Sequence, residues 1–406
     1  MSRRVVVTGI GMVTPLGVGV ASTWQGILDS RNAVGPIRRF DARNFPVTFA
    51  AEAPDPGPAG DVPAAVAHLA QDLKGRLGLA ALREAVQMAG GIVGGPRVGV
   101  CVGSEAARPL LADTAAQLRE GVPPTALALE RLAPNAPTRL LAALVGAAGP
   151  CTTISTACTS SSQAVGEALL RIRRGEADVM IAGGVDTLVD PIMVTGFSLL
   201  GALSTRNDAP QRASRPFDLD RDGFVLGEGA GFLILEERAY ALARGAEILG
   251  EVSGFGCSCN AYRITDSPPD GRGAAQSMEA ALRDARLNPE DIGYINAHGT
   301  STPMNDASET RGIHRAMGAA SRGVAVSSTK SMMGHLVAAC GAVEAILCLL
   351  AVRDGVLPPT INLDTPDPEC DLRHVPLFAE RAPIRHAMTN AFGFGGSNGT
   401  LILSRA

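Results

Sequence analysis

The chain repeats one pattern along most of its length: a short apolar strand, a glycine-rich turn and then a helix. Strands that alternate with helices fold into layered α/β structures, because the apolar faces of the sheet have to be covered by helices. The pattern therefore predicts an α/β fold. The expected strands are 5–7, 98–102, 152–155, 179–182, 292–296 and 324–328, and the expected helices are 163–173, 274–285 and 335–352.

An internal similarity indicates how this fold is organised. The segment VVVTGIG begins at Val5 and EVSGFG begins at Glu251, and each looks like an apolar strand that runs into a Gly-x-Gly turn. Repetition of one unit within a chain indicates a duplicated architecture. We therefore expect two similar halves, residues 1–250 and 251–406. A dinucleotide-binding turn is not expected, since Thr14 stands where the third glycine of that motif would lie.

Composition and charge exclude several classes of function. Acidic residues (40) nearly balance basic ones (36) and aromatic residues are 4% of the chain, so a nucleic-acid surface is not expected. The most apolar segment, 336–352, is too short for a membrane span and contains Glu344. The apolar N-terminal stretch is interrupted by Gly, Thr and Pro, unlike a signal peptide. We therefore expect a cytoplasmic protein.

The eight cysteines argue against a metal site and against a disulfide framework. They form no CxxC pair, and Cys257 and Cys259 lack companion ligands at zinc spacing. Several others lie within apolar patterns, as reduced buried thiols do.

One cysteine lies where a nucleophile could be placed. In CTTISTACTSSSQ, which begins at Cys151, a strand is followed by a turn that contains Cys158 and then by a helix. A position near a helix N-terminus is expected to lower the pKa of a thiol, and the small neighbours leave room for a substrate. We interpret Cys158 as a candidate nucleophile, with a packed structural thiol as the alternative.

Two histidines and a lysine follow other predicted strands. His298 lies after a strand, beside hydroxyls and Gly299, where a side chain can face a site. Lys330 lies between a strand and a helix, and His335 is expected at the start of that helix, where the helix and a nearby ammonium favour a neutral imidazole. Glu344 in the same apolar helix is interpreted as a buried, paired structural carboxylate.

Lysine is rare enough to direct attention to its positions. Lys74 and Lys330 are the only lysines among 36 basic side chains. We expect Lys74 on the polar face of a surface helix, where arginine would serve equally well. The segment NAFGFGGSNG, which begins at Asn390, predicts a flexible loop that can bring backbone N–H groups close to a ligand. Such a donor could complement one at Cys158 to hold an oxyanion.

Together these segments identify a family. The sequence resembles the β-ketoacyl-acyl-carrier-protein synthases, and among them the Cys-His-His condensing enzymes of the KAS II type. The resemblance covers essentially the whole chain and implies the thiolase fold, a five-layered αβαβα arrangement of two halves related by a pseudo-twofold axis. The motifs that carry it are VVVTGIGMVTPLG, STACTSS, RPFDLDRDGFVLGEGAG, INAHGTSTPMND, SSTKSMMGHLVAACGAVE, PPTINLDTPDPECDL and NAFGFGGSNG.

The resemblance also implies roles for individual residues. Cys158 matches the acyl-accepting nucleophile of the first half, and His298 and His335 match the paired catalytic histidines of the second half. Lys330 matches a lysine that orders the site electrostatically. The remaining matches are Phe394, a gate whose backbone N–H joins that of Cys158 in the oxyanion hole, and Thr300 and Thr302, whose hydroxyls hold the phosphopantetheine arm.

The implied reaction is a decarboxylative Claisen condensation. An acyl chain passes from an acyl carrier protein to Cys158 and is then elongated with malonyl-carrier protein, without a metal or an organic cofactor. The implied partners are the carrier protein and a second synthase-like chain. A thiolase is excluded because it would carry a second catalytic cysteine where this chain has Phe392, Phe394 and Ser397. A non-catalytic chain-length factor would lack Cys158.

Two segments depart from the family pattern. After the strand at 98–102 the family continues with a glycine-rich run, whereas this chain reads GSEAARP over 103–109. The stretch NAPT at 135–138 is also unlike the fatty-acid enzymes. Two interpretations therefore stay open: an elongating homodimer of fatty-acid synthesis, which we favour, and a type II polyketide or polyene ketosynthase paired with a Cys-less chain-length factor.

Overall fold

Two sets of strands with the same order and the same directions form the centre of the protein. The computed structural model describes residues 3–108 and 111–406. The first set contains β1 (Val5–Thr14), β5 (Val98–Gly103), β6 (Cys151–Ile154), β7 (Val179–Thr187) and β8 (Glu228–Glu237). The second set contains β9 (Gly250–Cys259), β10 (Tyr294–Asn296), β11 (Ala325–Ser327), β15 (His386–Phe392) and β16 (Ser397–Ser404).

The pairing within the two sets matches strand for strand. The first set runs β1-β8-β7-β5-β6, in which β8 pairs antiparallel with both β1 and β7, and the remaining pairs are parallel. The second set runs β9-β16-β15-β10-β11 with the same succession of directions. The two sets meet where β1 pairs with β9, at Val6 with Glu251 and Val7 with Gly250. The internal similarity in the sequence therefore corresponds to a repeated topology.

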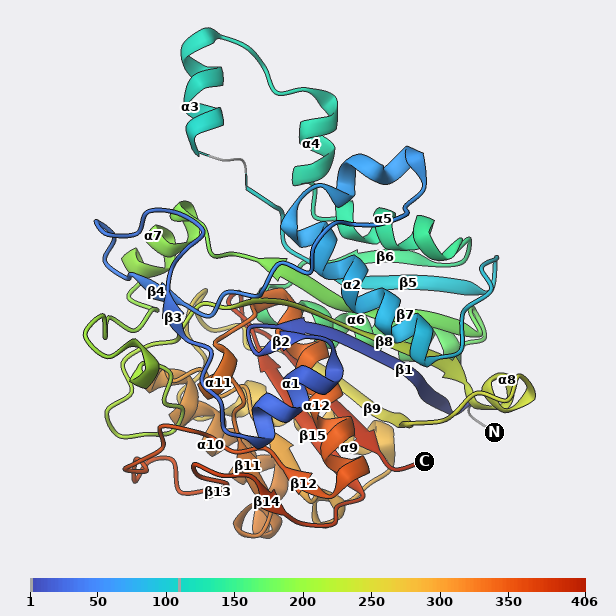
Figure 1. Ribbon diagram of the computed structural model, residues 1–406. Helices are drawn as coiled ribbons and strands as arrows, with labels where there is room; N and C mark the ends of the chain where they lie inside the picture. Colours follow the sequence, from blue (N-terminus) through green and yellow to red (C-terminus); the bar gives the residue numbers. More distant parts are fainter. Residues whose placement is uncertain (1–2, 109–110) are drawn as a thin grey trace.

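Helices cover and separate the two strand sets (Figure 1). Helix α6 (Ser160–Arg173) packs on β5 and β7, and α12 (Cys340–Asp354) packs on β8 and β15, so this pair lies between the sets. Helix α2 (Leu73–Met88) packs on the outer face of the first set, together with α5 (Ala136–Val145). Helix α9 (Arg272–Ala285) packs on β9 and β16, and α10 (Pro303–Met317) packs on α9. The layers are αβαβα, as the thiolase fold requires.

Glycine explains why the two similar segments look alike. A Cβ atom at Gly11 of β1 would lie 2.0 Å from the carbonyl oxygen of Ala81 in α2, and one at Gly256 of β9 would lie 2.1 Å from that of Ser277 in α9. Only glycine allows a helix backbone to approach a strand this closely. The prediction of Gly-x-Gly turns was wrong, because these glycines lie inside long strands and serve packing.

Smaller elements surround these layers. They are β2 (Gly17–Val18), β3 (Gly35–Pro36), β4 (Phe49–Ala50), β12 (Val356–Leu357), β13 (Arg373–His374), β14 (Glu380–Arg381), α1 (Val20–Leu28), α3 (Leu111–Glu120), α4 (Ala126–Leu132), α7 (Pro191–Leu199), α8 (Arg238–Ala243) and α11 (Lys330–Met333), with short 3-10 turns between them. Helices α3 and α4 project from the rest of the protein (Figure 1). Within the described ranges, we find no helix long and apolar enough to cross a membrane.

The functional segments lie after the carboxyl ends of parallel strands. Cys158 follows β6, His298 follows β10, and both Lys330 and His335 follow β11. In open α/β sheets this edge is where sites form. The helix expected from residue 335 begins later, at Cys340, so His335 lies in an extended segment before it. Its neutral state therefore cannot be attributed to a helix N-terminus.

Candidate active site

Cys158 lies in a tight turn between β6 and α6. Residues Ala157–Thr159 form a 3-10 turn, and α6 begins at Ser160. Ala157 has a φ of 52°, a left-handed conformation that is unusual for a residue with a side chain. The turn places Cys158 at the inner end of a cavity, with only 8% of the residue exposed. A strained backbone at such a position has to be held by its surroundings.

The environment of the thiol contradicts the expected lowering of its pKa. Burial raises the pKa of Cys158 to about 12, although Lys330 and the backbone N–H groups of Phe394 and Cys158 act in the opposite direction. Loss of hydration penalises the thiolate more than these groups favour it. The helix N-terminus that we expected to act on the sulfur begins two residues later, at Ser160. The resting group is therefore a thiol.

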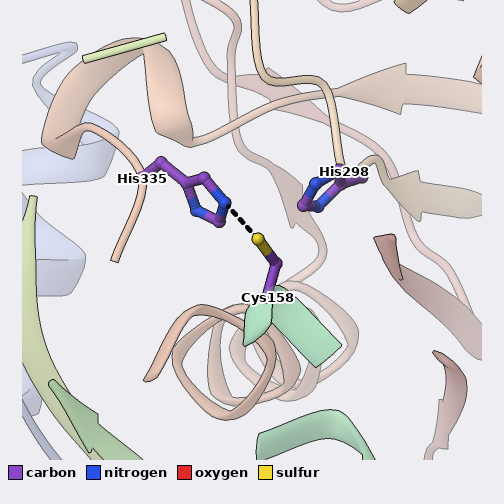
Figure 2. Close-up of side chains that lie close together, drawn as sticks. All are labelled: Cys158, His298 and His335. Atoms are coloured by element: carbon purple, nitrogen blue, oxygen red, sulfur yellow. Dashed lines mark hydrogen bonds between the residues drawn. The ribbon is translucent and has the colours of Figure 1, made fainter. Parts of the chain in front are cut away.

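His335 makes the closest polar contact with this thiol. Its Nε2 lies 3.0 Å from the Sγ of Cys158 (Figure 2). The Nδ1 accepts a hydrogen bond from the backbone N–H of Val337 at 3.3 Å, so the ring proton belongs on Nε2. Burial and then Lys330 hold the pKa of His335 well below 6.5, which keeps the imidazole neutral. The ring thus presents an N–H donor to the sulfur.

His298 faces the same point from the second half of the protein (Figure 2). Its ring centroid lies 5.2 Å from that of His335, and the two rings are nearly perpendicular, at 84°. Burial, Lys330 and His335 lower its pKa well below 6.5. Among the described residues its Nδ1 has no hydrogen-bond partner. Two neutral imidazoles therefore flank the sulfur.

Two carboxylates of α10 hold the loop that carries His298. Glu309 accepts the backbone N–H groups of His298 and Gly299, each at 2.8 Å, and Asp306 accepts that of Thr300 at 3.0 Å. Burial raises the pKa of Glu309 to about 7. Sequence reasoning missed Glu309. The sequence feature that could have identified it is its spacing: Glu309 follows Asp306 by three residues, so both acids lie on one face of the helix that follows the His298 loop.

Lys330 and Glu344 form a buried ion pair close to the histidines. Each side chain is 1% exposed, and Lys330 Nζ donates to Glu344 Oε1. Burial opposes the ammonium, but Glu344, together with Cys340 and Glu309, more than offsets this and raises the pKa of Lys330. Burial also raises the pKa of Glu344 to about 7, against the pull of Lys330. The paired, buried carboxylate that the sequence indicated is therefore present.

Lys74 is not the surface lysine that we expected. Lys74 is only 6% exposed, and its Nζ contacts Asp186 Oδ1 at 3.1 Å and the carbonyl oxygen of Glu105. The prediction was wrong because the loop that follows β5 and the end of β7 cover this position of α2, so that Lys74 does not face water. Both lysines of the chain are therefore buried and paired with carboxylates.

A cavity of about 450 Å³ leads to the sulfur and both histidines. Thr300 and Thr302 line it, and their hydroxyls lie 2.9 Å apart. Phe394, in the turn between β15 and β16, also lines it, and its ring centroid lies 6.3 Å from that of Phe197.

The segment 390–399 is mostly strand, so the predicted flexible loop reduces to residues 393–396. The atypical segments do not line the cavity as far as the structure describes them, and Pro109 lies outside the described residues.

The three side chains at the end of the cavity could also act as metal ligands. Ligand atoms of Cys158, His298 and His335 all lie within 4.8 Å of one another. Neutral imidazoles are competent ligands, but Lys330 lowers the pKa of both histidines, so its positive charge also opposes a cation here. The donor set suits nucleophilic chemistry on a thioester better than metal binding.

Comparison with known proteins places this geometry in a family. Residues 2–241 match the N-terminal domain of Beta-ketoacyl synthase and residues 249–364 match its C-terminal domain. A 3-oxoacyl-[acyl-carrier-protein] synthase 2 from Synechocystis sp. is 42% identical, over 99% of this chain and 98% of the relative. The actinorhodin polyketide putative beta-ketoacyl synthase 1 of Streptomyces coelicolor is 41% identical, over 100% of this chain and 89% of the relative.

Solved structures agree with the sequence matches. The ishigamide ketosynthase/chain length factor is 35% identical, with a TM-score of 0.91 and full coverage of both chains. A type II polyketide ketosynthase in complex with its acyl-carrier protein, AntDE:AntF, is 33% identical, with a TM-score of 0.88 and full coverage of both chains. The fold, the site and these matches show that the chain belongs to the beta-ketoacyl synthase family of acyltransferases, which form carbon–carbon bonds.

Proposed function

We propose that this synthase takes an acyl chain from an acyl carrier protein onto Cys158 and elongates it with malonyl-carrier protein. The observation that carries the proposal is the 3.0 Å contact between Cys158 Sγ and His335 Nε2 at the end of the cavity, with His298 beside them. A thiol and two neutral N–H-bearing rings are the groups that acyl transfer and enolate stabilisation require.

The first step is transfer of the acyl group to the thiol. The Cys158 sulfur attacks the thioester carbonyl, and the bond from that carbonyl to the carrier sulfur breaks. Because burial keeps Cys158 protonated, its proton leaves as the new bond forms and ends on the departing carrier thiol. The backbone N–H groups of Cys158 and Phe394 both face the sulfur and are placed to hold the oxyanion.

The second step forms the carbon–carbon bond. Malonyl thioester loses CO2, and the electron pair of the broken bond becomes an enolate whose oxygen needs hydrogen-bond donors. His335 offers a neutral Nε2–H for this, and His298 is the second donor that we assign. The carbanion then attacks acyl-Cys158, the β-ketoacyl carrier thioester forms, and Cys158 departs as a thiolate that is reprotonated.

Four residues support these steps without reacting. Lys330 adds to burial in keeping both imidazoles neutral, because a nearby ammonium disfavours imidazolium. The paired hydroxyls of Thr300 and Thr302 are placed on the cavity wall to hold the polar arm of phosphopantetheine. The ring of Phe394 stands beside the same cavity, where it can gate access to Cys158.

The projecting helices support a second synthase-like chain as the partner. Helices α3 and α4 and the loop between them form an arm that carries four exposed apolar residues. They are 53–79% exposed, and they are Leu118, Val122, Leu127 and Leu129. Helices of this length are marginal in water without packing, so an apolar arm of this kind requires a surface to cover it. The partner is either a second copy, as expected for fatty-acid synthesis, or a Cys-less chain-length factor, the kind of partner named in the ishigamide ketosynthase/chain length factor.

Mass photometry of the purified chain separates these two pathways. A homodimer favours the fatty-acid elongating enzyme, which we prefer on the identity to 3-oxoacyl-[acyl-carrier-protein] synthase 2. A monomer that dimerises only with a Cys-less paralogue favours the polyketide pathway. Leu127→Asp should weaken either association. The division into thiolase-like halves at 1–250 and 251–406 and the cytoplasmic location stay predictions.

Intact-mass spectrometry tests the reaction itself. The protein is incubated with carrier proteins that hold acyl chains of different lengths. We expect a stable mass increase equal to the acyl group, absent in Cys158→Ala, and the preferred length identifies the substrate class. The same adduct on Cys158→Ala would refute the nucleophile.

A further inference from the structure

A loop outside the substrate cavity touches the turn that carries Cys158. Strand β5 lies between β6 and β7, and Gly103 at its end is in register with Ile154 of β6 and Gly184 of β7. Glu105, two residues further on, is therefore flanked by the Cys158 turn on one side and by Asp186 on the other. Neither Glu105 nor Asp186 lines the cavity. Glu105 also belongs to the segment in which this chain departs from the glycine-rich pattern of its family.

The carboxylate of Glu105 binds the Cys158 turn on both sides of the nucleophile. Its Oε1 accepts the backbone N–H of Ala157 at 3.0 Å and the hydroxyl of Ser160 at 3.2 Å. Its Oε2 accepts the hydroxyl of Ser155 at 2.7 Å. These contacts engage the residue with the left-handed backbone, Ala157, and the first residue of α6. A charged acceptor gives stronger hydrogen bonds than a neutral one, so it can hold a strained turn.

Lys74 ties this loop to the segment that follows His335. Its ammonium binds the carbonyl oxygen of Glu105 and the Oδ1 of Asp186. The Oδ2 of Asp186 accepts the backbone N–H of Ala338 at 3.4 Å, next to Val337, whose N–H sets the ring of His335. One connected set of side chains therefore reaches both partners of the contact between Cys158 and His335.

We propose that Glu105 is a positioning residue for acyl transfer, which holds the Ser155–Ser160 turn so that Cys158 Sγ meets the thioester that enters the cavity, and that Lys74 and Asp186 fix its loop. This inference rests on the proposed function for the identity of the step. Glu105 contacts the turn that carries Cys158 and does not line the cavity. A displacement of about 1 Å in a nucleophile can reduce a rate by about 100-fold.

The test compares Glu105→Ala with Glu105→Gln. Glutamine can keep the arrangement, because its oxygen can accept from Ala157 while its amide donates to Ser155. Glu52→Ala is the matched control, because Glu52 also holds a loop by accepting backbone N–H groups, those of Arg38 and Arg39, away from Cys158. Each variant is checked for the wild-type thermal transition before rates are measured.

Two rates are then measured on each folded variant. One is acylation of Cys158 by octanoyl-carrier protein at saturating donor, and the other is alkylation of Cys158 by iodoacetamide. For Glu105→Ala we expect acylation about 10-fold slower at unchanged half-saturation. Alkylation should not slow, because removal of a negative charge near the sulfur favours the thiolate. Glu105→Gln and Glu52→Ala should stay within threefold of wild type in acylation.

The outcomes separate this inference from the proposed function. Equal acylation by Glu105→Ala and wild type, or equal loss in the Ala and Gln variants, would overturn the positioning role while leaving the nucleophile in place. If the wild type accepts no acyl group, the proposed function fails. The inference then fails if crystal structures of the wild type and Glu105→Ala show the same Cys158–His335 separation, and stands if that separation increases.

Discussion

Lys330 and Glu344 pair inside the protein, where each side chain is 1% exposed, and they connect α11 with α12 close to the two histidines. Glu344 Oε2 has no hydrogen-bond partner among the described residues, so Lys330 is the main compensation for its charge. The reverse also holds, because Glu344 raises the pKa of Lys330 against the effect of burial. The pair thus supplies a fixed positive charge that the histidines sense.

Removal of one partner should therefore cost more than removal of both. Glu344→Gln leaves a buried ammonium without its counter-charge, and we expect it to lower the free energy of unfolding by about 3–5 kcal/mol. The double variant Lys330→Met/Glu344→Gln should recover a large part of that loss while condensation stays impaired. Denaturant unfolding of both single variants and the double variant measures the coupling. Equal destabilisation of Glu344→Gln and the double variant would contradict an ionised pair.

The second buried lysine should not tolerate arginine. Lys74 fits its ammonium between Asp186 and the Glu105 carbonyl in a site that leaves 6% of the residue exposed, and a guanidinium is larger and planar. Lys74→Arg should lower the free energy of unfolding by about 1–3 kcal/mol, as overpacking does. Arg76→Lys on the same helix is the control, because its partner Asp55 is 48% exposed, and it should change stability by less than about 0.5 kcal/mol.

The positions of the site residues after strands could be predicted from the sequence, because each follows a short apolar run and lies in a specific motif. These residues are Cys158, His298, Lys330 and His335. The sequence did not reveal the burial that sets their chemistry. A turn that precedes a helix looks alike whether it is hydrated or dry, so the pKa of Cys158 was predicted in the wrong direction. Lys74 was misplaced for the same reason, because the helix pattern alone does not show which face other loops will cover.

The buried carboxylate of Glu309 should make stability depend on pH. Its pKa is raised from 4.5 to about 7 in the folded state, so between these values the folded protein binds more protons than the unfolded chain. Stability from this group is therefore full at low pH and is lost as the pH rises from about 4.5 to about 7. Relative to Glu309→Gln, the wild type should lose up to about 1.4 kcal/mol per pH unit in this window. Urea unfolding at pH 5, 6, 7 and 8 measures the difference, and a difference that rises with pH would contradict the assignment.

The two histidines should divide the labour between the steps. His335 presents its Nε2–H to the sulfur from a neutral ring, so its main contribution is a donor for the enolate rather than a base for the thiol. His335→Ala should keep acylation of Cys158 within about 10-fold of wild type but slow condensation by about 100–1,000-fold, the usual loss for one donor of an oxyanion hole. Intact-mass acylation and a carrier-protein condensation assay give the two rates on one preparation. The half-buried residue His314, which binds Ser321 and Asp371 away from the cavity, provides the control, because His314→Ala should change neither rate. Loss of acylation in His335→Ala with malonyl decarboxylation intact would reverse the assignment and make His335 the partner of the thiol.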